Sequence, residues 1–133
     1  RDMIGIAFTG SGKTLTFSLP LIMIALEEET KLPLEEGEGP CGVVLCPSRE
    51  LANQTFEVMG HFCKGLSKNG NGFPEIRCSL IIGGKPEREQ LEPIRRYGTH
   101  IIVATPGRLK HLLASKKVNF KKDLNIIKIK ETK

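Results

Sequence analysis

The feature that most constrains the fold is a glycine-rich segment near the start of the chain, which reads Ala7-Phe8-Thr9-Gly10-Ser11-Gly12-Lys13-Thr14. It follows a short apolar run at residues 3–6 and precedes a helical pattern. The order strand, glycine-rich turn, Lys-Thr and helix is typical of a phosphate-binding loop. Gly10 and Gly12 allow backbone N–H groups to turn inward around a polyphosphate. The helix that follows adds its own free N–H groups and the positive end of its dipole.

This pattern predicts a nucleotide site in which Lys13 reaches the β- and γ-phosphates and the hydroxyl of Thr14 coordinates Mg²⁺. The predicted nucleotide-binding residues are Thr9, Gly10, Ser11, Gly12, Lys13 and Thr14. The general form of the loop has glycine where this chain has Ala7, so the match to that form is its core, Gly-Ser-Gly-Lys-Thr. The alternative is a tight strand-to-helix turn that binds nothing, although such a turn has no use for Lys-Thr after two glycines.

Length and composition limit the class of protein. The 133 residues suffice for one domain with a sizeable core. No apolar run reaches 18 residues, so we expect no membrane span, and the charged start predicts no signal peptide and an intracellular protein. Because the chain does not begin with Met, we interpret it as a piece of a longer protein. Its cysteines form no C-x-x-C pair, which favours free thiols over a metal site.

Charge is spread unevenly along the chain. The net charge is +5, yet residues 27–40 hold six Glu and one Lys, so the remainder carries 19 basic against 9 acidic residues. A remainder of this kind suits a polyanionic partner, although basic faces exposed to water are the alternative. Six Phe and one Tyr are too few to predict a platform that stacks on bases.

Apolar patterning predicts strands that alternate with helices. We expect strands at residues 1–7, 42–46, 77–82 and 100–104, and residues 126–129 are a further candidate. The first helix is expected to be interrupted and kinked at Pro20 and followed by an acidic surface loop at residues 27–40. Ser48 is expected to cap the second helix, and the third is expected to break at Pro93. This alternation predicts an α/β fold with a doubly wound parallel sheet.

Each of the first four predicted strands ends at an unusual loop. These loops are the phosphate loop, Pro47-Ser48-Arg49-Glu50, Gly83-Gly84 and Thr105-Pro106-Gly107-Arg108. Because ligands bind beyond the carboxyl ends of parallel strands, we expect all four loops to share one edge of the domain. The last three offer guanidinium groups, Lys85, hydroxyls and backbone N–H groups, which suit a sugar-phosphate backbone held without reading its bases. Each of them taken alone is equally well an ordinary turn with a helix cap.

In this order, the loops resemble motifs of the DEAD-box family of RNA helicases. Residues 7–14 resemble its first motif, in which alanine is usual at the first position. Residues 47–52 resemble its Pro-Thr-Arg-Glu-Leu-Ala motif with Ser48 in place of threonine, and Gly83-Gly84 and residues 105–108 match two later motifs. Residues 5–9 and 46–49 are most similar to the Abstrakt-like subfamily.

The resemblance implies an incomplete RecA-like P-loop domain over residues 1–120, followed by a divergent basic tail at residues 121–133. It implies ATP and Mg²⁺ as cofactors and local separation of RNA duplexes by the intact helicase. It assigns the RNA sugar-phosphate backbone to Ser48, Arg49, Gly84, Thr105 and Arg108. Abstrakt-like members are associated with pre-mRNA splicing and the nucleus, so spliceosomal proteins are implied partners beside RNA.

Several parts of the family pattern have no counterpart in this sequence. The Asp-Glu-Ala-Asp motif expected after the strand that follows Arg108 is absent, and the acid that follows the candidate strand at residues 126–129 is Glu131. The upstream glutamine motif and the second RecA-like domain are absent too. We therefore expect a truncated or aberrantly ended helicase domain that binds nucleotide and RNA weakly and hydrolyses little ATP. The alternatives are a non-catalytic nucleotide-binding, RNA-binding or regulatory domain, a small nucleotide kinase, and a misread gene end.

Overall fold

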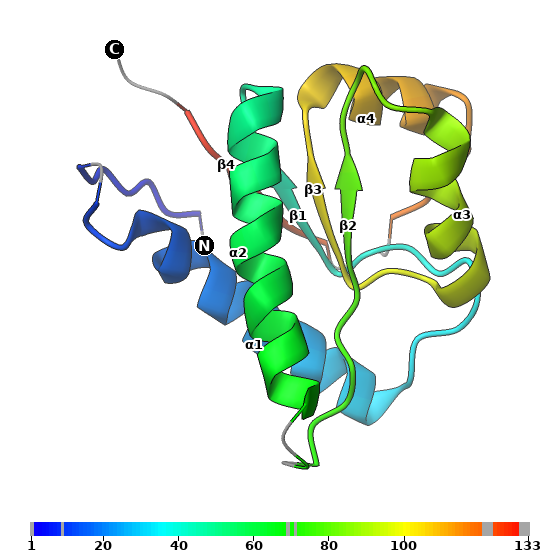
Figure 1. Ribbon diagram of the computed structural model, residues 1–133, viewed down its shortest axis with the longest axis horizontal. Coiled ribbons are helices and arrows are strands. Elements are labelled where there is room, and N and C mark those ends of the chain that lie inside the picture. Colours follow the sequence, from blue (N-terminus) through cyan, green and yellow to red (C-terminus); the bar gives the residue numbers. More distant parts are fainter. Residues whose placement is uncertain (1, 9, 69, 71, 121–123, 131–133) are drawn as a thin grey trace.

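Helices and strands alternate along the chain, as the patterning predicts (Figure 1). The computed structural model describes residues 2–8, 10–68, 70, 72–120 and 124–130. The elements are α1 (Lys13–Lys31), β1 (Gly42–Leu45), α2 (Arg49–Lys68), β2 (Cys78–Ile81), α3 (Glu87–Tyr97), β3 (Ile101–Ala104), α4 (Pro106–Ala114) and β4 (Asn125–Lys128).

The four strands form one parallel sheet in the order β2-β3-β1-β4. The register places Val43 of β1 opposite Ile102 of β3 on one side and Ile126 of β4 on the other. Parallel neighbours need crossover connections, and the helices between successive strands supply them. The prediction of a strand within residues 126–129 is confirmed by β4, so this part of the predicted basic tail lies in the sheet.

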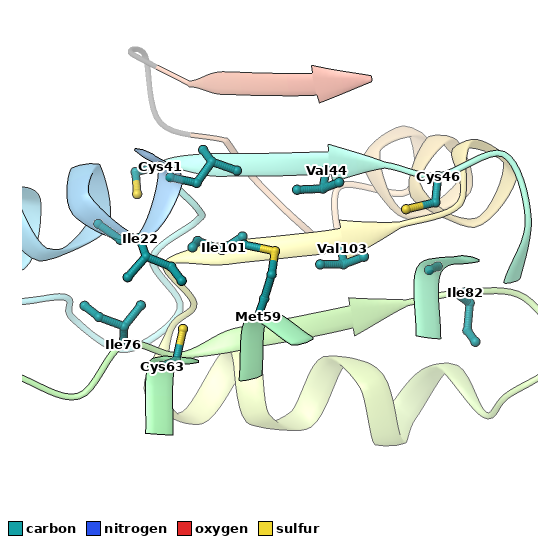
Figure 2. Close-up of a cluster of buried hydrophobic side chains, with 13 residues drawn as sticks. Ile22, Cys41, Val44, Cys46, Met59, Cys63, Ile76, Ile82, Ile101 and Val103 are labelled. Carbon is teal, nitrogen blue, oxygen red and sulfur yellow. The ribbon is translucent and has the colours of Figure 1, made fainter. Parts of the chain in front are cut away.

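Helices cover both faces of the sheet, which confirms the doubly wound α/β prediction. Val44, Ile101 and Val103 face α1 and α2, and Figure 2 shows Met59 of α2 reaching toward them. Their sequence neighbours in the strands point to the opposite face, where they pack with α3 and α4. The residues of this second core are Val43, Ile81, Leu91, Ile94, Ile102, Ala104, Leu109, Leu112 and Val118. Burial on both faces explains why β1 and β3 are continuous apolar runs.

The predicted first strand, residues 1–7, is wrong. Described residues 2–8 have no regular secondary structure, and Met3, Ile4, Ile6 and Phe8 are each 87–93% exposed. The central strand β1 already has two neighbours, β3 and β4. A strand needs a neighbour for its N–H and C=O groups, and this segment has none among the described strands, so it stays in contact with water.

Three predicted helix boundaries are also wrong. α1 runs through Pro20, and α3 runs through Pro93. An interior proline costs about 3 kcal/mol. In each of these two helices, apolar side chains close to the proline are buried against the sheet, and this burial offsets the cost. α1 also extends to Lys31, inside the predicted loop of residues 27–40, where Lys31 pairs with Glu27 one turn earlier at 2.8 Å.

The far end of α1 is joined to the start of β3 by a partly buried acid–base pair. His100 Nε2 and Glu29 Oε2 lie 2.7 Å apart, and the backbone N–H of Arg77 donates to His100 Nδ1 at 2.9 Å. Because Nδ1 accepts, Nε2 carries the hydrogen and donates to the carboxylate. This contact fixes the helix end opposite the phosphate loop.

Within the described part of the chain, no helix combines the length and the apolar character that a bilayer crossing requires.

Candidate functional site

The phosphate loop keeps the backbone shape that its glycines predict. Gly10 and Gly12 have φ values of 82° and 78°, a region that L side chains rarely adopt. A Cβ at either position would meet nothing within 4 Å, so backbone conformation rather than crowding requires glycine here. Gly12 is the N-cap of α1, and no side-chain hydrogen bond caps that helix. The first N–H groups of α1 are therefore left without a capping side chain, which is the arrangement that binds anions.

Local hydrogen bonds fold the loop onto itself. The ammonium of Lys13 reaches back and donates to the carbonyl oxygen of Ala7 at 3.1 Å. The hydroxyl and the N–H of Ser11 both donate to the carbonyl oxygen of Phe8, the N–H at 3.2 Å. Lys13 is exposed, and Thr14 is half-buried in the first turn of α1. This set of cationic, hydroxyl and N–H donors fits a polyphosphate.

The structure gathers five of the six predicted nucleotide-binding residues, Gly10 to Thr14, in this turn. The sixth, Thr9, lies outside the described residues, as does Glu131. In the described ranges, no group of three or more His, Cys, Asp or Glu is arranged to hold a metal ion.

A second group of predicted residues meets where β1 and β2 end. Arg49 begins α2, and its guanidinium lies against the Gly83-Gly84 turn that follows β2. A Cβ on Gly84 would lie 2.5 Å from Arg49 Nη1, and one on Gly83 would lie 3.4 Å from Arg49 Nη2. Gly84 also has a φ of 80°. The two glycines thus leave the space that the arginine occupies.

Helix caps complete this edge of the sheet. The Ser48 hydroxyl accepts the N–H of Leu51 at 3.2 Å, which confirms Ser48 as a cap of α2. Thr105 is the N-cap of α4 but makes no side-chain cap bond, and its N–H donates to the carbonyl of Ile81 at 3.1 Å. In the first turn of α4, Arg108 Nη1 is buried and has no partner within the described structure.

Three of the four loops directly follow strands of the sheet and so lie at its carboxyl edge. β1, β2 and β3 are followed by Ser48 and Arg49, by Gly84, and by Thr105 and Arg108, respectively. The phosphate loop is preceded by residues 2–8, which form no strand. The prediction that each loop follows a strand therefore holds for three of the four.

One residue at this edge escaped the sequence analysis. Gln90 of α3 donates from Nε2 to the carbonyl oxygen of Ile82 at 2.9 Å, and its Oε1 is buried without a partner in the described structure. The sequence signal was slight: a polar side chain immediately before Leu91, on the apolar side of an amphipathic helix.

The chain is similar to helicases in sequence. The model of the DEAD/DEAH box helicase family matches residues 1–130. The chain is 60% identical over 121 residues to the probable ATP-dependent RNA helicase ddx41 of Dictyostelium discoideum, a match that covers 91% of this chain and 18% of that protein. It is 59% identical over 116 residues to the ATP-dependent RNA helicase abstrakt of Drosophila melanogaster, covering 87% and 18%. The chain thus spans under a fifth of the length of these relatives.

Solved structures of similar shape agree with the sequence matches. The yeast DEAD-box splicing factor Prp28 superposes with a TM-score of 0.78 at 30% identity, covering 96% of this chain and 28% of that one. The RNA helicase Prp28 from Chaetomium thermophilum bound to ADP gives a TM-score of 0.74 at 33% identity, with the same coverage.

Proposed function

Because this chain belongs to the DEAD/DEAH box helicase family, we propose that it supplies the phosphate-binding residues and part of the RNA-binding surface of an ATP-dependent RNA helicase. Its parallel sheet with helices on both faces is the RecA-like fold of the matching helicase structures. The observation that carries the proposal is the uncapped start of α1 behind two glycines of positive φ, with the ammonium of Lys13 drawn over the loop.

ATP would be held by its phosphates. The N–H groups at the start of α1 and around Gly10 and Gly12 would donate to phosphate oxygens, favoured by the helix dipole. The Lys13 ammonium would exchange the neutral carbonyl of Ala7 for a charged phosphate oxygen, which is a stronger acceptor. Magnesium, held by Thr14 and the phosphates, would supply charge neutralisation.

RNA would lie along the edge formed by Ser48, Arg49, Gly84, Thr105 and Arg108. Guanidinium groups pair with phosphate oxygens in a planar, two-pronged geometry. Two polar groups support this assignment. The Thr105 hydroxyl makes no hydrogen bond to the start of α4, and Arg108 Nη1 has no hydrogen-bond partner in the described protein, so both are left for a ligand. Contacts of this kind recognise the backbone and not the base sequence.

Within the whole protein, we propose ATP-driven separation of RNA duplexes, in the nucleus and alongside spliceosomal proteins. The similarity to the splicing factor Prp28 and to a pre-mRNA-processing helicase, PRP5, supports the link to splicing. A second candidate is a domain that binds nucleotide and RNA without turnover. Residues 129–133, which directly follow β4, favour this candidate because they contain one acid, Glu131, and no adjacent pair of carboxylates.

Binding measurements on the 133-residue chain test the proposal. Titration with a fluorescent ATP analogue and Mg²⁺ is expected to saturate, and a single-stranded RNA is expected to bind with an affinity that falls as salt rises. RNAs of equal length and different sequence are expected to bind equally at one salt concentration. An affinity that varied strongly among those RNAs, or failure to bind either ligand, would overturn the assignment.

A further inference from the structure

The Gly83-Gly84 turn beside Arg49 is fixed by a hydrogen bond from a side chain that is not among the predicted site residues. Gln90 lies on α3, and its Nε2 donates to the carbonyl oxygen of Ile82, eight residues earlier, at 2.9 Å. Ile82 immediately precedes Gly83-Gly84. The bond therefore closes the connection from β2 to α3 across the two glycines.

α3 is itself anchored near Gln90. Glu87, in the first turn of α3, pairs with His111 of α4 at 3.3 Å and also with Lys117. Leu91 and Ile94 of the same helix are buried in the core beneath the sheet. Gln90 thus projects from a helix that is fixed at its start and along its buried face.

The bond to Ile82 sets the direction of a neighbouring N–H. The carbonyl of Ile82 and the N–H of Gly83 belong to one planar peptide unit, in which the two groups point in opposite directions. Because Gln90 holds the carbonyl toward α3, the Gly83 N–H points away from that helix. Within the described structure, no hydrogen bond is donated by the N–H of Gly83 or Gly84.

The guanidinium of Arg49 lies against the same two glycines. Successive backbone N–H groups that include a residue of positive φ, such as Gly84, form a concave anion site. An RNA phosphate at this turn would thus receive donors from the backbone and from Arg49 together. The relative placement of these donors depends on the Ile82–Gly83 peptide unit.

We propose that Gln90 is a positioning residue for RNA binding. It holds this peptide unit so that the Gly83 N–H and the Arg49 guanidinium bind one backbone phosphate. The inference rests on the proposed RNA-binding function. The buried, partnerless Oε1 supports it. An apolar side chain of similar length would fill the position without that cost, so the amide is there for the hydrogen that it donates.

The test compares the full chain with Gln90→Met, which keeps the length of the side chain and removes the donor. The dissociation constant for a single-stranded oligouridine is expected to rise roughly threefold to tenfold, the range for one lost hydrogen bond. The dissociation constant for the ATP analogue is expected to stay unchanged, and the amide NMR signals of Gly83 and Gly84 are expected to move. Gln54→Met, at an exposed position of α2, is the matched control and is expected to change none of these.

A double-mutant cycle with Arg49→Ala separates the inference from its premise. In the Arg49→Ala background, Gln90→Met is expected to cost much less RNA affinity than in the wild-type chain, because both changes disable one site. If Arg49→Ala leaves RNA affinity unchanged, the proposed RNA edge is wrong. If Arg49→Ala weakens binding while Gln90→Met has no effect or a fully additive one, the edge stands and the role of Gln90 is wrong.

Stability is followed in parallel by thermal melting. If Gln90→Met does not fold, Gln90→Glu keeps the shape and replaces the donor by an ionised acceptor, and the same RNA loss is expected. If neither variant folds, Gln90 is a residue of the fold alone and the inference is overturned.

Discussion

Lys13 is exposed, and the one hydrogen bond of its side chain in the described structure goes to a neutral carbonyl, that of Ala7. Removing its ammonium should cost little stability, whereas a bound triphosphate would be deprived of a charged hydrogen bond. We predict that Lys13→Ala lowers affinity for the ATP analogue tenfold or more, because a hydrogen bond to a charged group contributes about 1.5–3 kcal/mol of binding. The free energy of unfolding is expected to change by under about 1 kcal/mol.

Affinity is measured by fluorescence titration, and stability is measured by thermal melting without nucleotide. Lys31→Ala, which removes an exposed cation at the other end of α1, is the control and is expected to leave nucleotide affinity unchanged. A large fall in the melting temperature of nucleotide-free Lys13→Ala would contradict the prediction.

Arg49 and Arg108 are the two guanidinium groups that the fold brings to the proposed RNA edge. Replacing both by Ala is expected to weaken RNA binding and to reduce the slope of log affinity against log salt by about 1 for each phosphate that the protein no longer binds. RNA titrations over a range of salt concentrations measure the slope. Arg88→Ala, at an exposed position of α3, is the matched control. Unchanged RNA binding in the double variant would remove the assignment of this edge.

The end of helix α1 that lies away from the phosphate loop is held by the carboxyl group of Glu29, which pairs with His100. Burial by itself raises the pKa of Glu29, but hydrogen bonds from His100 and the Leu34 N–H, with the charge of Arg77, outweigh it and hold the pKa below the usual 4.5. A carboxyl whose pKa is lowered by folding stabilises the fold above its unfolded pKa, and that stabilisation is lost as pH falls through the folded pKa.

We therefore predict that Glu29→Gln destabilises the chain by about 1.5–3 kcal/mol at pH 7, the range for hydrogen bonds to a charged group. The difference in the free energy of unfolding between variant and wild type is expected to shrink as pH falls below 4.5. Urea unfolding at several pH values measures it, with Glu36→Gln in the exposed loop as the control. A difference that did not change with pH would show that the charge of Glu29 contributes nothing.

Strand β4 has one face on the core and one in water. Ile127 packs against the core, whereas Ile126 is 60% exposed. We predict that Ile127→Asp lowers the free energy of unfolding by about 2–3 kcal/mol because it places a charge against apolar side chains, and that Ile126→Asp changes it by under about 1 kcal/mol. Urea unfolding compares the two. Equal, small effects would show that β4 does not contribute to the stability of the domain.

In the molecule as a whole, the phosphate loop and the acidic segment 27–40 lie at opposite ends of α1. The helix has 19 residues and so is about 28 Å long. It separates the phosphate loop from the acidic residues of segment 27–40. An anionic ligand would therefore meet the loop without strong repulsion from that segment, since the separation exceeds the Debye length of roughly 8–10 Å near physiological salt.

The chain holds groups that bind phosphates, but its sequence has no paired acids after β4 to hold magnesium and activate water. We predict that the 133-residue chain binds the ATP analogue yet releases phosphate from ATP at a rate close to that of a protein-free blank, with or without RNA. A phosphate-release assay measures this rate, with Lys13→Ala as the baseline. Turnover comparable to that of an intact helicase would contradict the prediction and also exclude the candidate without turnover.

Local patterns in the sequence were enough to determine several features of this protein. The apolar runs at residues 42–46 and 100–104 predicted β1 and β3, because strands covered on both faces must be apolar throughout. The glycines and Lys-Thr of residues 10–14 predicted the turn and the helix start, because positive φ is a property of the residue itself. Ser48 was identified as a cap for the same kind of local reason.

Only the tertiary structure decided which apolar segments become strands and which polar groups meet. Residues 3–6 form an apolar run like that of β1, but β1 is paired by β3 and by β4, which arrives some 80 residues later in the sequence. Pro20 and Pro93 stay inside helices because packing on the sheet outweighs their local cost. The contact of Arg49 with Gly84, and that of Gln90 with Ile82, join separate elements. Such contacts depend on long-range pairing and packing, which no local pattern in the sequence encodes.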